Sequence, residues 1–221
     1  MLILGIDTST SAIGAGLSDG GGVLAATHRI DARGHTEQRA PLIATLLADS
    51  GVAPRDLTAV VVGNGPGPFT GLRVGMVTGL TMAHALGIPV HGLCSLDVLA
   101  HQGAAITHGE ILVATDARRK EVYWARYRVG PTAHEVERLT EPAVDRPAEL
   151  PDDVRSLPTV GRGPVLYPDL FPNALHPHDV DAGLLALLGG RGIAAGVTMP
   201  VEPLYLRRPD ALTNAERGVP S

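Results

Sequence analysis

The chain is poor in cysteine, in aromatic residues and in positive charge, and each shortage excludes a class of protein. Its one cysteine, Cys94, cannot form an internal disulfide, and the apolar residues around it predict a buried thiol in a reducing cytosol. Aromatic residues are 3% of the 221 residues, so aliphatic side chains and alanine must fill the core. The formal net charge of −5 argues against a protein that binds nucleic acid alone, because such proteins neutralise phosphates with surplus Lys and Arg.

Long apolar runs are also lacking. No stretch approaches the roughly 20 apolar residues of a membrane-spanning helix, and the apolar run that opens the chain ends at Asp7, too early for a secretory signal. These absences predict a soluble cytoplasmic protein with no membrane partner. A length of 221 residues and a hydrophobic content of 44% are enough for one domain or for two compact lobes with a real core.

The order of predicted elements indicates a mixed sheet with helices. The first half predicts strands at 2–6, 12–17, 23–30, 59–63 and 88–92, and helices at 36–50, 70–86 and 95–102. Pro41 lies either in the first turn of its helix or at a kink. The second half repeats the layout of strand, aspartate and strand around Asp116, as the first half has it around Asp7, which suggests a diverged duplication. We expect lobes at 1–103 and 104–221, the second with Pro-rich loops, a helix at 182–188, an extended segment at 197–208 and a flexible tail.

The helix at 70–86 carries a ridge of small residues, because Gly71, Gly75, Gly79 and Ala83 recur at every fourth position. Each mid-helix glycine costs about 1 kcal/mol relative to alanine, so close approach of another backbone must offset the cost. The ridge packs either on its own sheet or on another subunit, and we expect the second. Gly75→Leu or Gly79→Leu should then abolish association and leave the monomer folded. The predicted partner interface comprises Leu42, Ile43, Leu46, Gly71, Leu72, Arg73, Gly75, Met76, Gly79, Leu80 and Ala83.

Four motifs together are similar to one known family. The stretches are LGIDTST at 4–10, GNGPGPFTGLRVG at 63–75, DARRKEVYWARY at 116–127 and PLYLR at 203–207. They resemble the TsaB family, whose members are non-catalytic dimerisation subunits of the bacterial machinery that makes threonylcarbamoyladenosine in tRNA. The resemblance runs over nearly the whole chain. It implies an actin-like ATPase fold of two α/β lobes, and binding of the catalytic paralogue TsaD, or of a second copy, through the first two helices.

The resemblance also implies a supporting role beside TsaD and the ATPase subunit TsaE, with tRNA reached only through the complex. The catalytic paralogue carries two metal-binding histidines four residues apart, and Leu93 and Asp97 stand at about that place here. Leucine cannot bind a metal, and the other histidines lack ligand spacing. The sequence has no zinc-binding motif, and no histidine lies near Ser9 or Ser11 in the sequence to act as a base. We therefore expect no catalytic residue and no metal.

An actin-like ATPase or small-molecule kinase is the alternative function. It would use Asp7 and the loop 63–71, with Asp7, Thr8, Ser9, Gly65 and Gly67 as candidates for weak ATP or ADP binding. Against it, Asn64 stands where such loops usually have an acidic residue for Mg²⁺, and Pro66 and Pro68 remove two backbone N–H donors. We therefore expect a rigid turn and no bound cofactor.

The sequence allows two roles for each of two sets of basic residues. Arg118, Arg119 and Lys120 form a turn that is either simply solvated, which we favour, or a contact patch for a partner or for tRNA. Arg73, one turn into the helix at 70–86, would meet either a phosphate or, as we favour, a carboxylate from a neighbouring protein.

Overall fold

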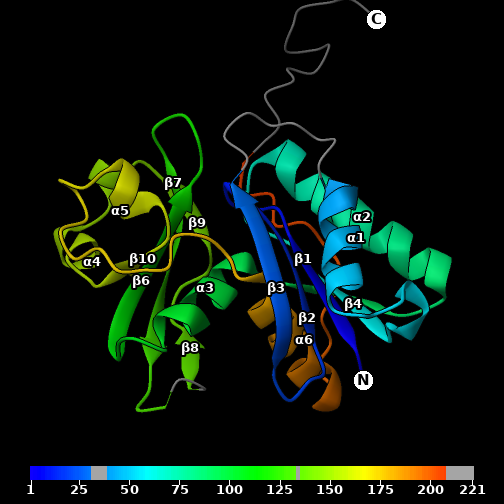
Figure 1. Ribbon diagram of the computed structural model, residues 1–221. Coiled ribbons are helices and arrows are strands. Elements are labelled where there is room, and N and C mark those ends of the chain that lie inside the picture. Colours follow the sequence, from blue (N-terminus) through cyan, green and yellow to red (C-terminus); the bar gives the residue numbers. More distant parts are fainter. Residues whose placement is uncertain (31–38, 133–134, 208–221) are drawn as a thin grey trace, which may run out of the picture.

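The computed structural model describes residues 1–30, 39–132 and 135–207 and shows two lobes side by side, each built on its own sheet (Figure 1). The predicted tail after 207 and the predicted helix start at 36–38 lie outside the described residues. The prediction of two α/β lobes of mixed sheet is confirmed.

The sheet of the N-terminal lobe has the strand order β3-β2-β1-β4-β5. Its strands are β1 (Ile3–Asp7), β2 (Ala12–Ser18), β3 (Val23–Ile30), β4 (Ala59–Gly63) and β5 (Val90–Leu93). The first three run antiparallel to their neighbours, whereas β4 and β5 continue the sheet parallel to β1. The antiparallel and the parallel parts of the sheet therefore meet at β1. The mixed sheet predicted from the order of elements is confirmed.

The helices of this lobe are α1 (Arg39–Asp49), α2 (Phe69–Leu86) and α3 (Ser95–Gly103), with a short 3-10 turn η2 (Pro54–Asp56). Pro41 lies in the first turn of α1, where its missing N–H costs nothing. Helix α2 ends at Gly87, which takes the left-handed conformation with φ 65°. The predictions for these three helices are confirmed to within a few residues.

The second sheet has the order β10-β6-β7-β8, with β9 also pairing β7. Its strands are β6 (Gly109–Asp116), β7 (Val122–Val129), β8 (Val136–Arg138), β9 (Ala143–Asp145) and β10 (Thr159–Val160). The Pro-rich stretches form the short elements η3 (Pro147–Glu149), α4 (Asp152–Arg155) and α5 (Gly163–Leu166). Strands β6 and β7 form an antiparallel hairpin with a parallel neighbour, β10, just as β1 and β2 have β4. This likeness agrees with the duplication hypothesis.

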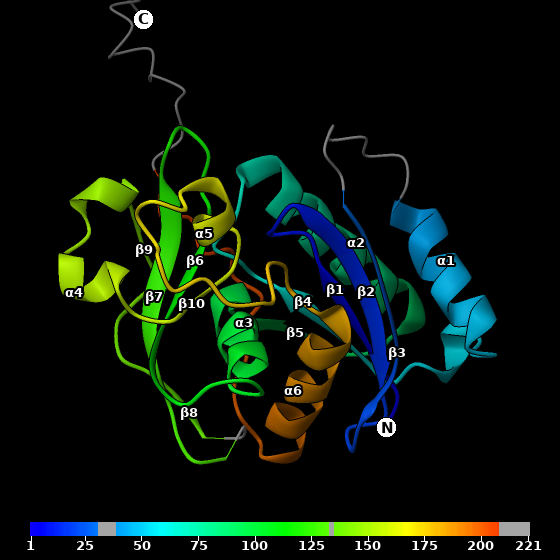
Figure 2. The same cartoon turned by 60° about the vertical axis from the view of Figure 1, so that its left-hand side comes forward.

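The C-terminal part of the chain corrects the predicted domain boundary. Helix α6 (Ala182–Ala194) starts at Asp181, whose carboxylate accepts hydrogen bonds from the backbone N–H groups of Gly183 and Leu184. It packs on β1 and β2, on the face opposite α1 and α2 (Figure 2). The lobe that begins at residue 1 thus takes a helix from the far end of the chain, because the inner face of its sheet needs apolar cover.

Alternation along β1 explains this layering. Leu4 and Ile6 point into the core shared with α1 and α2, whereas Ile3 points into a second core that α6, α3 and the second sheet also fill. A core that draws on both lobes holds them together. Within the described part of the chain no helix is long and apolar enough to cross a membrane.

Candidate functional site: the interlobe cleft and the outer face of α2

The first candidate site is Asp7, at the end of β1. Its side chain is 1% exposed. It accepts hydrogen bonds from Ser9, through the backbone N–H at 2.9 Å and the hydroxyl at 2.8 Å, and from the Ser95 hydroxyl at 2.7 Å. Burial raises the pKa of Asp7, although the hydrogen bonds from Ser95 and Ser9 act to lower it. The oxygens of Asp7 are thus already engaged by residues of the same lobe.

The glycine loop after β4 packs directly on this group. A Cβ at Gly63 would overlap Asp7 Oδ2, and a Cβ at Gly67 would lie 2.6 Å from the carbonyl oxygen of Ser9. The two segments that grip phosphates in an actin-like ATPase are therefore in mutual contact at Gly63 and Gly67. Asn64 lies in the same packed loop and its Oδ1 has no hydrogen-bond partner among the described residues.

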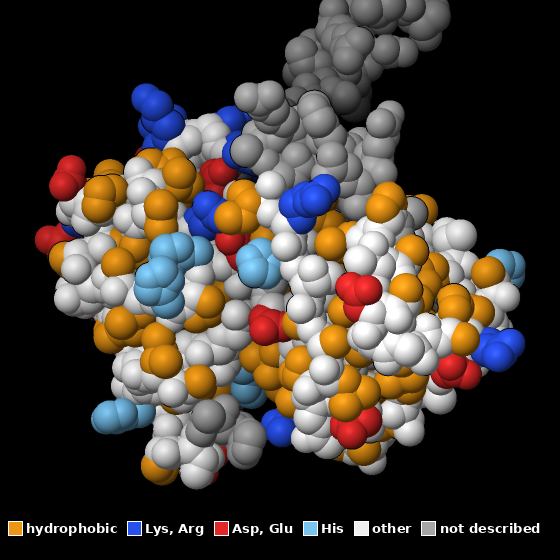
Figure 3. Space-filling view, viewed as in Figure 1, with side chains coloured by type: hydrophobic (Ala, Val, Ile, Leu, Met, Phe, Trp, Pro, Cys, Tyr) orange, Lys and Arg blue, Asp and Glu red, His pale blue; other side chains and the backbone are white. Residues whose placement is uncertain are grey.

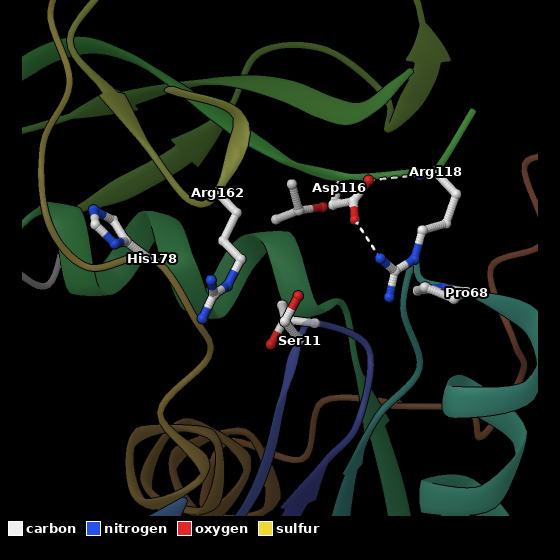
Figure 4. Close-up of a pocket in the computed structure, with 8 residues that line it drawn as sticks. Ser11, Pro68, Asp116, Arg118, Arg162 and His178 are labelled. Atoms are coloured by element: carbon white, nitrogen blue, oxygen red, sulfur yellow. Dashed lines mark hydrogen bonds and ion pairs between the residues drawn. The ribbon is translucent and has the colours of Figure 1, made fainter. Parts of the chain in front are cut away.

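The space between the lobes is divided: beside Ser11 and Asp116 it is very small, whereas a larger cavity is lined by Gly67 and Pro68 of the glycine loop and by the turn after β6. A cavity of about 10 Å³ is lined by Ser11, Asp116, Arg118, Arg162 and His178, among others. Figure 4 shows the Arg118 guanidinium turned back onto Asp116, at 3.0 Å, and the Arg162 side chain directed towards Ser11. This volume holds about one water molecule, whereas small-ligand pockets enclose about 300 to 1,000 Å³. Of the candidate nucleotide residues, Thr8 and Gly65 also lie in the packed loops: the Thr8 hydroxyl donates to the carbonyl of Gly71 at 2.7 Å.

The small-residue ridge of α2 lies on the protein's own sheet, which corrects the argument made from its spacing. A Cβ at Gly71 would lie 2.8 Å from the carbonyl oxygen of Thr8, and a Cβ at Gly75 would overlap the Thr8 hydroxyl. Gly79 faces Val62 of β4 in the same way. The close approach that offsets the glycine cost is thus intramolecular. Gly75→Leu or Gly79→Leu must therefore disturb the monomer itself.

Most of the predicted interface residues belong to the core under α1 and α2. Seven are buried there in the same chain, namely Ile43, Leu46, Leu72, Gly75, Met76, Gly79 and Ala83. Leu42 and Gly71 are half-buried, and only Arg73 and Leu80 are exposed. Spacing identified a helix with a ridge, but it did not indicate which face meets the sheet.

The outward face of α2 is apolar nonetheless. Val77 is 59% exposed and Leu80 41%, and a shallow groove of about 420 Å³ runs over Arg73, Val74, Val77 and Met82. We call Arg73, Val74, Val77, Leu80, Thr81 and Met82 the outer face of α2. Figure 3 shows hydrophobic side chains interspersed with acidic and basic ones on the side of the molecule where α1 lies in front of α2. Val77 was missed from the sequence, although its spacing from Arg73 would have indicated a face turned away from the sheet.

The place of the missing metal site is occupied by other contacts. Leu93 ends β5, and Asp97, in the first turn of α3, accepts hydrogen bonds from Arg138 at 2.5 Å and from the Tyr127 hydroxyl at 2.8 Å. No group of three or more His, Cys, Asp or Glu side chains suited to a metal ion occurs in the parts of the chain that the structure describes.

Comparisons of the sequence find related proteins over nearly the whole chain. The family model for TsaD, the tRNA N6-adenosine threonylcarbamoyltransferase, matches residues 18–156. The tRNA threonylcarbamoyladenosine biosynthesis protein TsaB of Escherichia coli is 36% identical over 224 residues, which cover 94% of this chain and 95% of that protein. An uncharacterised protein of Mycobacterium leprae is 44% identical over 216 residues; the match covers 95% of this chain but only 56% of that relative.

A comparison of structures agrees. YeaZ from Pseudomonas aeruginosa superimposes with a TM-score of 0.74 and 29% sequence identity, covering 93% of this chain and all of that one. A crystal structure from P. aeruginosa, of an uncharacterised protein with similarity to peptidase YeaZ, gives a TM-score of 0.77 at 28% identity and covers 93% of this chain and 99% of that one. The fold of two α/β lobes that the resemblance implied is thus confirmed.

Proposed function

Because the chain belongs to the TsaB family, within the wider family that the TsaD model describes, we propose that it is a non-catalytic subunit for tRNA threonylcarbamoyladenosine synthesis. In this role it binds the catalytic paralogue TsaD and supports the transfer of the threonylcarbamoyl group to the adenosine beside the anticodon. The reaction takes place in the cytoplasm, with TsaE as a further subunit and tRNA contacted through the complex.

The observation that carries this proposal is the apolar outer face of α2. Exposed aliphatic side chains that line a groove on a helix are suited to a partner helix, because their burial removes apolar surface from water. In the absence of TsaD, the same face of a second copy can cover it and give a homodimer.

The non-catalytic role is supported by the two sites where chemistry would be expected. Asp7 is engaged by Ser9 and Ser95, and Leu93 occupies the approximate place of a metal ligand in the paralogue. The alternative of an actin-like ATPase or kinase requires space beside Asp7, and Gly63 fills that space. Titration calorimetry with ATP and Mg²⁺ should show no tight binding, and a phosphate-release assay no turnover, by the purified chain.

The scaffold role is tested by Val77→Asp on the outer face of α2. A buried, unpaired carboxylate in an apolar interface costs several kcal/mol, so the affinity for TsaD of the same organism should fall by about 100-fold or more. The control is Thr107→Asp in the loop after α3, on another part of the molecule, which should bind like the wild type. Affinities are measured by calorimetry after circular dichroism shows equal folding. Unchanged binding by Val77→Asp contradicts the proposed interface.

A further inference from the structure

A second, larger cavity lies beside the first turn of α2. Its volume is about 550 Å³, within the range of ligand pockets. One wall is formed by Phe69 and Arg73 of α2, another by Arg118 and Arg119 in the turn after β6, and a third by the extended C-terminal segment at 205–207. The start of α2 and the β6–β7 turn lie close together at the top of Figure 1.

The extended C-terminal segment is fixed in place across both lobes. The backbone N–H of Gly92 donates to the carbonyl of Met199 at 3.0 Å, and that of Leu204 to Asn64 at 2.9 Å. Arg207 then forms an ion pair with Glu121 of the second lobe. The walls of the cavity are therefore held before any ligand enters, which lowers the entropy lost on binding.

The charge of this cavity is opposite to that of the whole chain. Four arginines line it and no acidic residue does so among the described residues, whereas the formal net charge of the protein is −5. Arg118 forms an ion pair with Asp116, and Arg207 forms one with Glu121. Neither acidic residue lines the cavity. Arg119 also has a partner, whereas Arg73 makes no ion pair with any described residue.

Arg73 is nevertheless held in a defined position. Its guanidinium carbon lies 3.7 Å from the centre of the Phe69 ring, and its Nε donates to the Tyr205 hydroxyl at 2.7 Å. Phe69 and Tyr205 are themselves in contact, with ring centres 5.2 Å apart. A guanidinium fixed against aromatic rings is well placed to bind a carboxylate through its other N–H groups, and apolar area surrounds that point.

The occupant is indicated by the continuity of the two surfaces. Arg73 lines both this cavity and the groove on the outer face of α2. The groove and the cavity are therefore contiguous. A protein that binds to the outer face of α2 can extend a segment directly into the cavity. The pairing of guanidinium and aromatic groups selects a segment with an acidic residue beside a large apolar one.

We propose that this cavity receives an acidic segment of the protein that docks on the outer face of α2. A carboxylate of the segment pairs with Arg73, and a large apolar side chain of the segment packs on Phe69 and Tyr205. This inference rests on the proposed function, in that the docked protein is TsaD.

The test compares Arg73→Gln with Arg128→Gln, which removes one positive charge from an exposed site on β7 that pairs with Glu137. Binding to TsaD of the same organism is measured by calorimetry at 50 and 300 mM salt. Arg73→Gln should weaken binding by about tenfold or more, as loss of one partner of a shielded charge pair does, and should reduce the salt dependence. Arg128→Gln should stay within about twofold of the wild type. Arg119→Gln, on the opposite wall, serves as a second variant if Arg73→Gln lowers the melting temperature.

A second probe separates this inference from the proposed function. It is a fluorescein-labelled ten-residue peptide that contains Glu and Phe, with a control peptide in which Gln replaces Glu. Fluorescence anisotropy should show binding of the Glu peptide to the wild type, loss in Arg73→Gln and no binding of the Gln peptide. If TsaD does not bind the wild type, the proposed function fails and the peptide result alone decides this inference. If neither probe distinguishes Arg73→Gln from Arg128→Gln, the inference is overturned.

Discussion

Each lobe begins its sheet with a hairpin whose first strand ends in an aspartate, Asp7 in β1 and Asp116 in β6. The two carboxylates differ in their surroundings. Asp7 is enclosed and bound by hydroxyl and backbone donors, whereas the side chain of Asp116 is 17% exposed and pairs with Arg118 at 3.0 Å. The two aspartates therefore have the same position in their hairpins, but the residues around them give them different burial and different partners.

The neighbours that differ come from outside the hairpins. In the N-terminal lobe, Gly63 at the end of β4 and Ser95 at the start of α3 close over the carboxylate. In the second lobe, the corresponding parallel strand is β10, and Gly161 after it approaches the backbone of Ala114 instead. Asp7 is thus enclosed within its lobe, whereas Asp116 is half-buried and lines the small cavity between the lobes.

The largest expected effect comes from reopening the Asp7 enclosure. Gly63→Ala places a methyl group on Asp7 Oδ2, and the carboxylate can move away only by giving up its hydrogen bonds to Ser9 and Ser95. We expect a loss of about 3 kcal/mol in the free energy of unfolding, measured by urea denaturation. Gly22→Ala is the matched control, because a Cβ there has no atom within 4 Å and should change stability by less than about 1 kcal/mol. An equally stable Gly63→Ala protein contradicts the packing described for this loop.

Replacing each aspartate with asparagine should have the next largest effect on stability, and the effect should differ between the two positions. Asp7→Asn replaces an acceptor of three hydrogen bonds and should cost about 2 kcal/mol near pH 4. Because burial raises the folded-state pKa of Asp7, the stability that its protonated form contributes is present below about pH 4 and is lost as the pH rises through the folded-state value. Asparagine does not titrate, so the deficit of Asp7→Asn should shrink between pH 4 and pH 7.

Asp116→Asn should cost less, about 1 kcal/mol, because a rim ion pair contributes little. Denaturation curves at several pH values measure both variants. A deficit of Asp7→Asn that grows towards neutral pH would mean that the hydrogen bonds, not burial, dominate the titration of this carboxyl group.

The smallest effect concerns the contact between the lobes. The Tyr123 hydroxyl donates to the carbonyl of Gly67 across the cleft at 3.3 Å. Tyr123→Phe should lower the free energy of unfolding by about 1 kcal/mol, because it leaves a buried carbonyl without its donor. Tyr167→Phe, on the core of the second lobe alone, is the control. Differential scanning calorimetry shows whether the transition broadens in Tyr123→Phe only, and the same broadening in both variants would argue against a specific role of this bond.

Local patterns in the sequence predicted most of the fold. The change from strand patterns to a helical period predicted α1, α2 and α3. The layout of strand, aspartate and strand around Asp7 and Asp116 predicted that both lobes begin with a similar hairpin. Pro66 and Pro68 predicted a rigid turn, since each proline removes an N–H donor whatever the fold, and the expectation that this loop holds no nucleotide stays a prediction. The Arg73 hypothesis, a carboxylate from a neighbour, stays a prediction.

The set of helices and strands follows from the sequence, because helical and strand periods depend on residues a few positions apart. The direction in which α2 turns its glycine ridge depends on the packing of the whole molecule, since Gly75 meets Thr8 and Gly79 meets Val62 across long sequence separations. The same packing also decided that α6 joins the first lobe and that Tyr205 holds Arg73, 132 positions away. Contacts of that kind depend on how completed elements pack, and no local pattern encodes them.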